Sequence, residues 1–169
     1  MSQTIEKIVY QEEITSRYNT IAGTVTGVLA IGFLGALIKE LVSPTARYSW
    51  AVPLGLFCLF LLICIAMFII RTLKITITEE ALTVAFRFIH KAVPLNKINK
   101  YSIEKNPNGA YRAQGMYNKT VDGNRSWVYS ASTPPKIVLD LKEEKYSRLV
   151  FSSNNPEQII DILDVLLKL

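Results

Sequence analysis

Two stretches of the sequence decide the fold: NTIAGTVTGVLAIGFLGALI, from Asn19 to Ile38, and YSWAVPLGLFCLFLLICIAMFII, from Tyr48 to Ile70. Neither stretch contains Asp, Glu, Lys, Arg or His. A helix needs about 20 mostly apolar residues to cross a hydrocarbon layer about 30 Å thick, with every backbone amide paired inside the helix. Both stretches reach that length. The sequence therefore predicts a transmembrane helical hairpin over residues 19–70, with spans at 19–38 and 48–70.

The connection between the spans, KELVSPTAR at residues 39–47, has charged ends and a central Pro44. It suits a short turn at the lipid headgroups, which makes the spans antiparallel. Lys7 and Arg17 precede the first span and Arg71, Lys74 and Arg87 follow the second, whereas the turn contains Lys39 and Arg47. By the positive-inside rule we expect both termini in the cytoplasm and the chain in the cell inner (cytoplasmic) membrane.

Small residues mark the first span, where Gly23 and Gly27 have the four-residue spacing that lets two helix backbones approach closely. The bulky second span is one partner for this surface, and a second copy or another membrane protein is the alternative. The absence of Asp, Glu, Lys, Arg and His from both spans argues against a channel or a transporter. Cys58 and Cys64, both in the second span, lie about 120° apart around a helix and are not expected to pair with each other.

Before the hairpin, residues 1–18 form a polar segment that contains Ile5, Ile8, Val9 and Ile14. Their spacing is compatible with a short helix lying along the membrane interface. This N-terminal interfacial segment is too polar for a signal peptide.

After the hairpin, residues 71–169 have the length of one small domain. They contain 15 Lys and Arg against 10 Asp and Glu, so the formal net charge of +5 lies entirely in this part of the 169-residue chain. Apolar and polar residues alternate here, as in half-buried strands. The expected strands cover residues 73–78, 82–88, a short piece ending at 93, 100–104, 110–117, 126–130, 136–141 and 146–151.

A helix is expected over residues 156–169, because Asn155 is a favourable cap and Pro156 a favourable first residue. Its broad apolar face must pack against the strands. The chain is thus expected to be α+β: a two-helix transmembrane hairpin followed by an antiparallel, partly closed β barrel or sandwich with a C-terminal helix at its open end.

Four segments carry a resemblance to the bacterial pleckstrin-homology-like (PH-like) membrane proteins with an N-terminal helical hairpin. They are Ile77–Val84, Val93–Ile98, the pair Gly115–Tyr117 and Trp127–Tyr129, and Asn155–Glu157. The resemblance implies a PH-like domain at residues 71–169 and a binding or scaffolding role, without naming a ligand.

Side chains for chemistry are few. His90 is the only histidine, and residues 71–169 contain no cysteine, so neither a thiol site nor a zinc site is indicated. We expect no enzymatic activity, no cofactor and no metal. Without a basic run interleaved with aromatics, nucleic acid is not an expected partner either.

Residues 105–127 mix aromatic and basic side chains, which are typical of binding patches. One interpretation places Tyr111, Met116, Trp127 and Tyr129 in the core of the domain. The other side chains would then remain on an exposed rim that contacts a partner protein or lipid phosphates: Arg112, Tyr117, Lys119 and Arg125.

These features favour a membrane-anchored accessory subunit or assembly factor of a membrane protein complex, with homo-oligomerisation left open. The alternative is binding of anionic lipid headgroups, or lipid sensing, at the cytoplasmic surface. A hydrolase with an unrecognised site would require a deep polar cleft.

Overall fold

The computed structural model describes residues 7–42, 50–106, 111, 113–131, 135–142 and 146–168. The chain divides into two compact units. Residues 17–71 form the first unit, and the segments before and after them form the second. The second unit is therefore discontinuous in sequence, with the first unit inserted into it.

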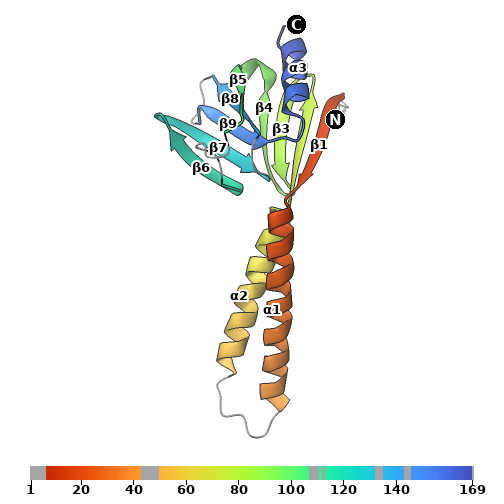
Figure 1. Ribbon diagram of the computed structural model, residues 1–169, viewed down its shortest axis with the longest axis vertical. Coiled ribbons are helices and arrows are strands. Elements are labelled where there is room, and N and C mark those ends of the chain that lie inside the picture. Colours follow the sequence, from red (N-terminus) through yellow and green to blue (C-terminus); the bar gives the residue numbers. More distant parts are fainter. Residues whose placement is uncertain are drawn as a thin grey trace, which may run out of the picture. The chain divides into compact units, whose positions relative to one another are not determined.

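The inserted unit is a pair of helices, α1 (Arg17–Val42) and α2 (Ala51–Ile69), which lie side by side (Figure 1). Glycine permits their close approach, since a Cβ at Gly23 would lie 3.4 Å from Cβ of Met67 and one at Gly27 would lie 3.5 Å from Sγ of Cys64. The side-chain amide of Asn19 also donates a hydrogen bond of 2.9 Å to the carbonyl of Ile70. Part of the expected turn at 39–47 lies outside the described residues.

Both helices are long and apolar enough to cross a membrane, by length and composition. None of the 19 residues of α2, all of them described, is buried in the protein. In α1 the buried residues are Asn19, Gly23 and Ala30, which are small or polar. The large apolar side chains of this unit therefore point mainly outward.

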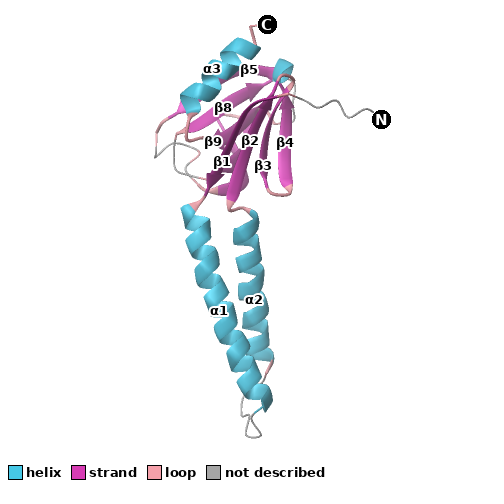
Figure 2. Ribbon diagram, turned by 90° about the vertical axis from the view of Figure 1, so that its right-hand side faces the viewer, coloured by secondary structure: helices cyan, strands magenta, loops and turns pink. Residues whose placement is uncertain are grey.

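The first sheet consists of β1 (Ile8–Thr15), β2 (Thr72–Thr78), β3 (Ala81–Phe86) and β4 (Ile89–Pro94). All neighbours are antiparallel and follow the chain order (Figure 2). The prediction of an interfacial helix in residues 1–18 is wrong, because Ile8–Thr15 forms the strand β1. Its burial alternates with period two at Glu12 and Ile14, because this segment is hydrogen-bonded to β2.

A 3₁₀ turn, η1 (Leu95–Lys97), leads into the second sheet. Its strands are β5 (Ile98–Glu104), β6 (Gly115–Val121), β7 (Asn124–Ser130), β8 (Lys136–Leu141) and β9 (Arg148–Ser152), in the order β5-β8-β9-β7-β6.

This sheet is not wholly antiparallel as expected, since β9 pairs in parallel with β7. β9 lies between β8 and β7 in the sheet. It runs antiparallel to β8, which precedes it in the chain, and in the same direction as β7. The described strands form two separate sheets rather than a closed barrel.

The core lies between the two sheets. Alternate residues of β2 and β3 face it from one side, including Leu73, Ile75 and Phe86, which are fully buried. Phe86 stacks on Tyr129 of β7, with ring centroids 6.0 Å apart. Helix α3 (Pro156–Leu166) begins at the expected residue and buries Ile159 and Leu163, but it ends three residues earlier than expected.

Candidate functional site

The β6–β7 hairpin carries the described part of the expected rim. Its two-residue turn, Asp122 and Gly123, has positive φ at both positions (51° and 77°), which is the geometry of a tight hairpin turn. The strand before it was expected at 110–117 and occurs at 115–121, so Lys119 lies within β6 and not beyond its end.

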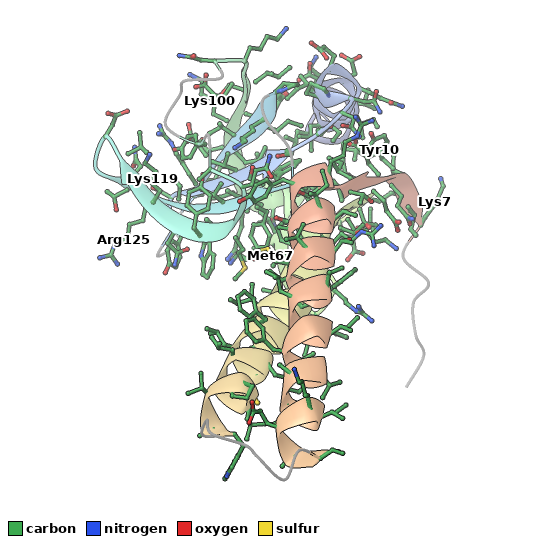
Figure 3. The ribbon with its side chains drawn as sticks, turned by 60° about the horizontal axis from the view of Figure 1, so that its bottom comes forward. Lys7, Tyr10, Met67, Lys100, Lys119 and Arg125 are labelled. Atoms are coloured by element: carbon green, nitrogen blue, oxygen red, sulfur yellow. The ribbon has the colours of Figure 1, made fainter. Side chains whose placement is uncertain are left out.

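Beside this turn is a shallow hollow of about 150 Å³. Asn118, Lys119 and Thr120 of β6 line it together with Arg125 of β7 and Tyr146. Figure 3 shows Lys119 and Arg125 on this hairpin. The lining offers two cations with amide and hydroxyl groups, a combination suited to an anionic group.

The structure does not unite the four rim residues in one surface. Arg112 lies outside the described residues. Lys119 pairs with Ser126 and Thr120 pairs with Arg125, so the alternation of side chains along a strand directs Lys119 and Arg125 to opposite faces of the hairpin. Both nevertheless border the hollow.

Tyr117, one of the four expected rim residues, is partly buried against a small core. Its ring packs against the buried cluster of Tyr111, Val128 and Val150 on the face of the second sheet that points away from the first. Burial raises the pKa of the Tyr117 phenol, which keeps the hydroxyl neutral.

The sequence interpretation missed Tyr146 as a neighbour of the hollow. Its ring lies 4.6 Å from that of Trp127, measured between centroids. Trp127 is two residues from Arg125 and therefore on the same face of β7. The signal available in the sequence was the alternation of Arg125 and Trp127 along one strand, which places an aromatic side chain on the same face as Arg125.

Lys136 was also missed, and its side chain is fully buried. The ammonium donates hydrogen bonds to the backbone carbonyls of Tyr111 and Ala113. Burial lowers its pKa from 10.5 to about 8. An amine of this kind is a potential nucleophile, but within the described residues its side chain has no exposed surface. We therefore assign Lys136 to holding that segment on the sheet.

An ion pair lies on the same outer face, where Nε of Arg148 is 2.7 Å from Oδ1 of Asp140. The hydrogen bond to Asp140 raises the pKa of Arg148. Nearby, the Tyr111 hydroxyl and Ser126 Oγ are 3.0 Å apart. These polar groups are engaged with one another across neighbouring strands.

Glu12 forms a further polar centre, at the edge strand β1. The residue is 8% exposed. It accepts hydrogen bonds from the backbone N–H of Asn154 at 2.7 Å and the hydroxyl of Ser153 at 2.8 Å. The Tyr10 hydroxyl donates a third bond of 3.2 Å. Glu12 thus ties the segment before α1 to the entrance of α3.

Comparison with protein-family models, curated proteins and solved structures finds no match to this chain. Within the described residues, no group of three His, Cys, Asp or Glu side chains is placed to hold a metal ion.

Proposed function

We propose that this chain is a membrane-anchored, non-enzymatic binding module that serves as an accessory subunit or assembly factor of a membrane protein complex. The observation that carries the proposal is the outward apolar surface of α1 and α2. In water, such surface is unfavourable by about 25 cal/mol per Å². A bilayer removes this penalty and also explains why the small residues face the partner helix.

The pairing of β1 with β2 supports an even number of membrane crossings. β1 precedes α1 and β2 follows α2, yet Thr15 lies opposite Thr72 in the antiparallel ladder. Two strands can pair only if they are on the same side of the bilayer. Lys7, Arg17, Arg71, Lys74 and Arg87 flank the hairpin, against Lys39 and Arg47 between the spans, so the positive-inside rule favours the cytoplasmic side of the inner membrane.

A PH-like relationship of the domain is part of the proposal. Two packed sheets followed by a C-terminal amphipathic helix support it, whereas the parallel β7–β9 pair is a departure from an all-antiparallel arrangement. Such a module would act by surface recognition. Tethering to the membrane would raise its effective concentration near membrane-bound partners.

A second candidate function, recognition of anionic lipid headgroups, is favoured by one observation. The hollow on the β6–β7 hairpin is bordered by exposed Lys119 and Arg125, in the part of the chain that carries all of the net positive charge. Each basic residue near an anionic surface contributes about 1 kcal/mol of attraction.

The test is affinity purification of the full chain in mild detergent, followed by identification of both proteins and lipids. The double variant Lys119→Glu and Arg125→Glu is compared with Lys100→Glu, an exposed lysine on β5. Specific loss of a co-purifying protein from the double variant supports the accessory role. Specific loss of anionic lipid supports the second candidate. Identical protein and lipid content in all three samples rejects the hairpin as the binding site.

A further inference from the structure

The turn between β3 and β4 lies at a defined end of the first sheet. Across the four strands, Ile14 is opposite Leu73, Leu73 is opposite Phe86, and Phe86 is opposite Ile89. This row is the last but one before the chain leaves β1 for α1. The turn residues Arg87 and Phe88 therefore lie at the same end of the sheet as Thr15 and Thr72 (Figure 2).

Two exposed apolar side chains mark this end. Phe88 is 71% exposed and Ile89 is 39% exposed. Phe88 is the most exposed of the large apolar side chains described in residues 7–16 and 72–168. The guanidinium of Arg87 lies over the Phe88 ring, 5.2 Å from its centroid, so the turn presents an aromatic ring and a cation together.

Arg87 also occupies a backbone conformation that is unfavourable for its residue type. Its φ is 43°, in the left-handed region where a glycine would avoid a penalty of about 1–2 kcal/mol. Glycine would serve the turn better if the turn only had to connect two strands. An arginine there indicates a use for the side chain.

The covalent chain limits the distance between this turn and the end of α2. Two residues, Ile70 and Arg71, separate Ile69, the last residue of α2, from Thr72, and the three Cα–Cα steps between them span at most about 10 Å. β4 is two strands from β2 in the sheet, which is about 10 Å at 4.8 Å per strand. The headgroup layer adds about 5–7 Å on each side of the hydrocarbon.

We propose that the β3–β4 turn is a third point of membrane contact, in which Phe88 enters the boundary between headgroups and acyl chains and Arg87 binds the phosphates of anionic lipids in the same leaflet. This inference rests on the proposed membrane anchoring of α1 and α2. Aromatic rings favour the interfacial layer, and a guanidinium pairs with phosphate through several donors. The occupant of this surface is the bilayer that holds the helices.

The experiment measures the depth of three positions in the full chain. Single cysteines replace Phe88, Glu80 or Leu62 in a background with Cys58→Ala and Cys64→Ala, and each carries a nitroxide label. The protein is reconstituted in phosphatidylcholine mixed with phosphatidylglycerol. Electron paramagnetic resonance then compares collisions with oxygen, which concentrates in lipid, and with a nickel chelate, which stays in water.

We expect oxygen to dominate at positions 62 and 88, and the nickel chelate to dominate at position 80. Glu80 is a matched control because it lies in the β2–β3 turn, at the opposite end of the same sheet. If position 88 is as accessible to the chelate as position 80 while position 62 is in lipid, the proposed contact is wrong and the anchor stands. If position 62 is also in water, the proposed anchoring itself fails.

The role of Arg87 is tested separately. Arg87→Gly relieves the positive-φ strain, so the domain should unfold no more readily than the parent. The label at position 88 should lie deeper in the mixed bilayer than in pure phosphatidylcholine, and Arg87→Gly should abolish that difference. Equal depth in the two bilayers for the parent chain would overturn the assignment of Arg87 to anionic lipid.

Discussion

At the scale of single residues, Glu12 is a buried carboxylate on an edge strand. It is satisfied by three donors, two of which come from the segment between β9 and α3. Hydrogen bonds to a charged group contribute about 1.5–3 kcal/mol each, and a donor left unpaired in the interior is destabilising. One side chain therefore couples the two ends of the discontinuous domain.

Glu12→Ala should lower the free energy of unfolding by about 2–4 kcal/mol, because it leaves the N–H of Asn154 without its acceptor. Pulse proteolysis of the full chain in detergent measures this change. Glu13→Ala is the matched control, since Glu13 is exposed and pairs with Lys74 at 3.8 Å. Its effect should stay within about 1 kcal/mol. Equal effects of the two substitutions would contradict the role of Glu12.

Lys136 makes stability depend on pH. Between about pH 8 and 10.5 the unfolded chain still holds the proton on this amine that the folded chain has lost. The free energy of unfolding therefore rises with pH across this window. Below about pH 8 the amine is protonated in both states, and the full penalty is present. That penalty is on the order of 3 kcal/mol.

Lys136→Met should abolish this rise. Hydrogen exchange of the β8 and β9 amides in the full chain, corrected for intrinsic exchange, reports it below pH 10.0, the ordinary pKa of tyrosine. Burial raises the pKa values of Tyr10, Tyr117 and Tyr129 in the folded chain. Above pH 10.0 these groups therefore lower the free energy of unfolding as the pH increases. Lys100→Met, at an exposed site, should keep the parent slope. A slope that survives in Lys136→Met would exclude Lys136 as its source.

At the scale of elements, the contact between α1 and α2 depends on glycine residues, which have no side chain to separate the helices. A leucine at Gly23 would meet Met67 and Phe68 of α2, whereas the described residues leave 4 Å of open space around a Cβ at Gly32. Overpacking of this kind is destabilising by about 1–3 kcal/mol. The two glycines therefore form a matched pair of sites on one helix.

Gly23→Leu should separate the helices, and Gly32→Leu should not. Cys64 reports the separation, since its Sγ lies 3.4 Å from the Gly23 carbonyl. In a Cys58→Ala background in mild detergent, the modification of Cys64 by a permeant maleimide should accelerate in Gly23→Leu only. Acceleration by both substitutions would point to a general loss of helix structure.

Elements with local signals were predictable from the sequence. The spans follow from uninterrupted apolar runs, and α3 follows from Asn155 and Pro156 at its start. β1 was not predictable in this way because its partner, β2, lies beyond the whole hairpin. The parallel placement of β9 likewise depends on which strands it pairs with, and no local sequence pattern determines that pairing.

The candidate site was predictable only in part, for a related reason. Lys119 and Arg125 were correctly placed near a turn, but their opposite directions depend on the register of β6 with β7. Tyr117 was expected on the rim because it resembles a surface aromatic in the sequence. Only the packing of Tyr111 over the outer face of the sheet shows that Tyr117 is partly covered.

At the scale of the whole molecule, the discontinuous domain defines what a soluble form must contain. Residues 72–169 alone lack β1 and the Glu12 carboxylate. Thr15 and Thr72 lie opposite each other, so a two-residue Asn-Gly turn can join them in place of the helices. We expect residues 1–15 joined in this way to residues 72–169 to fold without detergent.

The comparison is between this fused chain and residues 72–169 alone. The fused chain should unfold cooperatively and give dispersed amide resonances. The shorter chain should aggregate or lack these features, because β2 becomes an unprotected edge. Cooperative unfolding of both chains with equal stability would mean that β1 is dispensable.

For the proposed membrane-anchored protein, the pairing of β1 with β2 also imposes an order on biogenesis. The ribosome delivers β1 first, and its partner emerges only after both apolar segments have been synthesised. Until then β1 lacks the strand with which it pairs. A chain with only one segment inserted would leave the two strands on opposite sides of the lipid, unable to meet. Maturation of the domain thus depends on completed insertion, and protease resistance of β1 in nascent chains would report that the second segment has crossed.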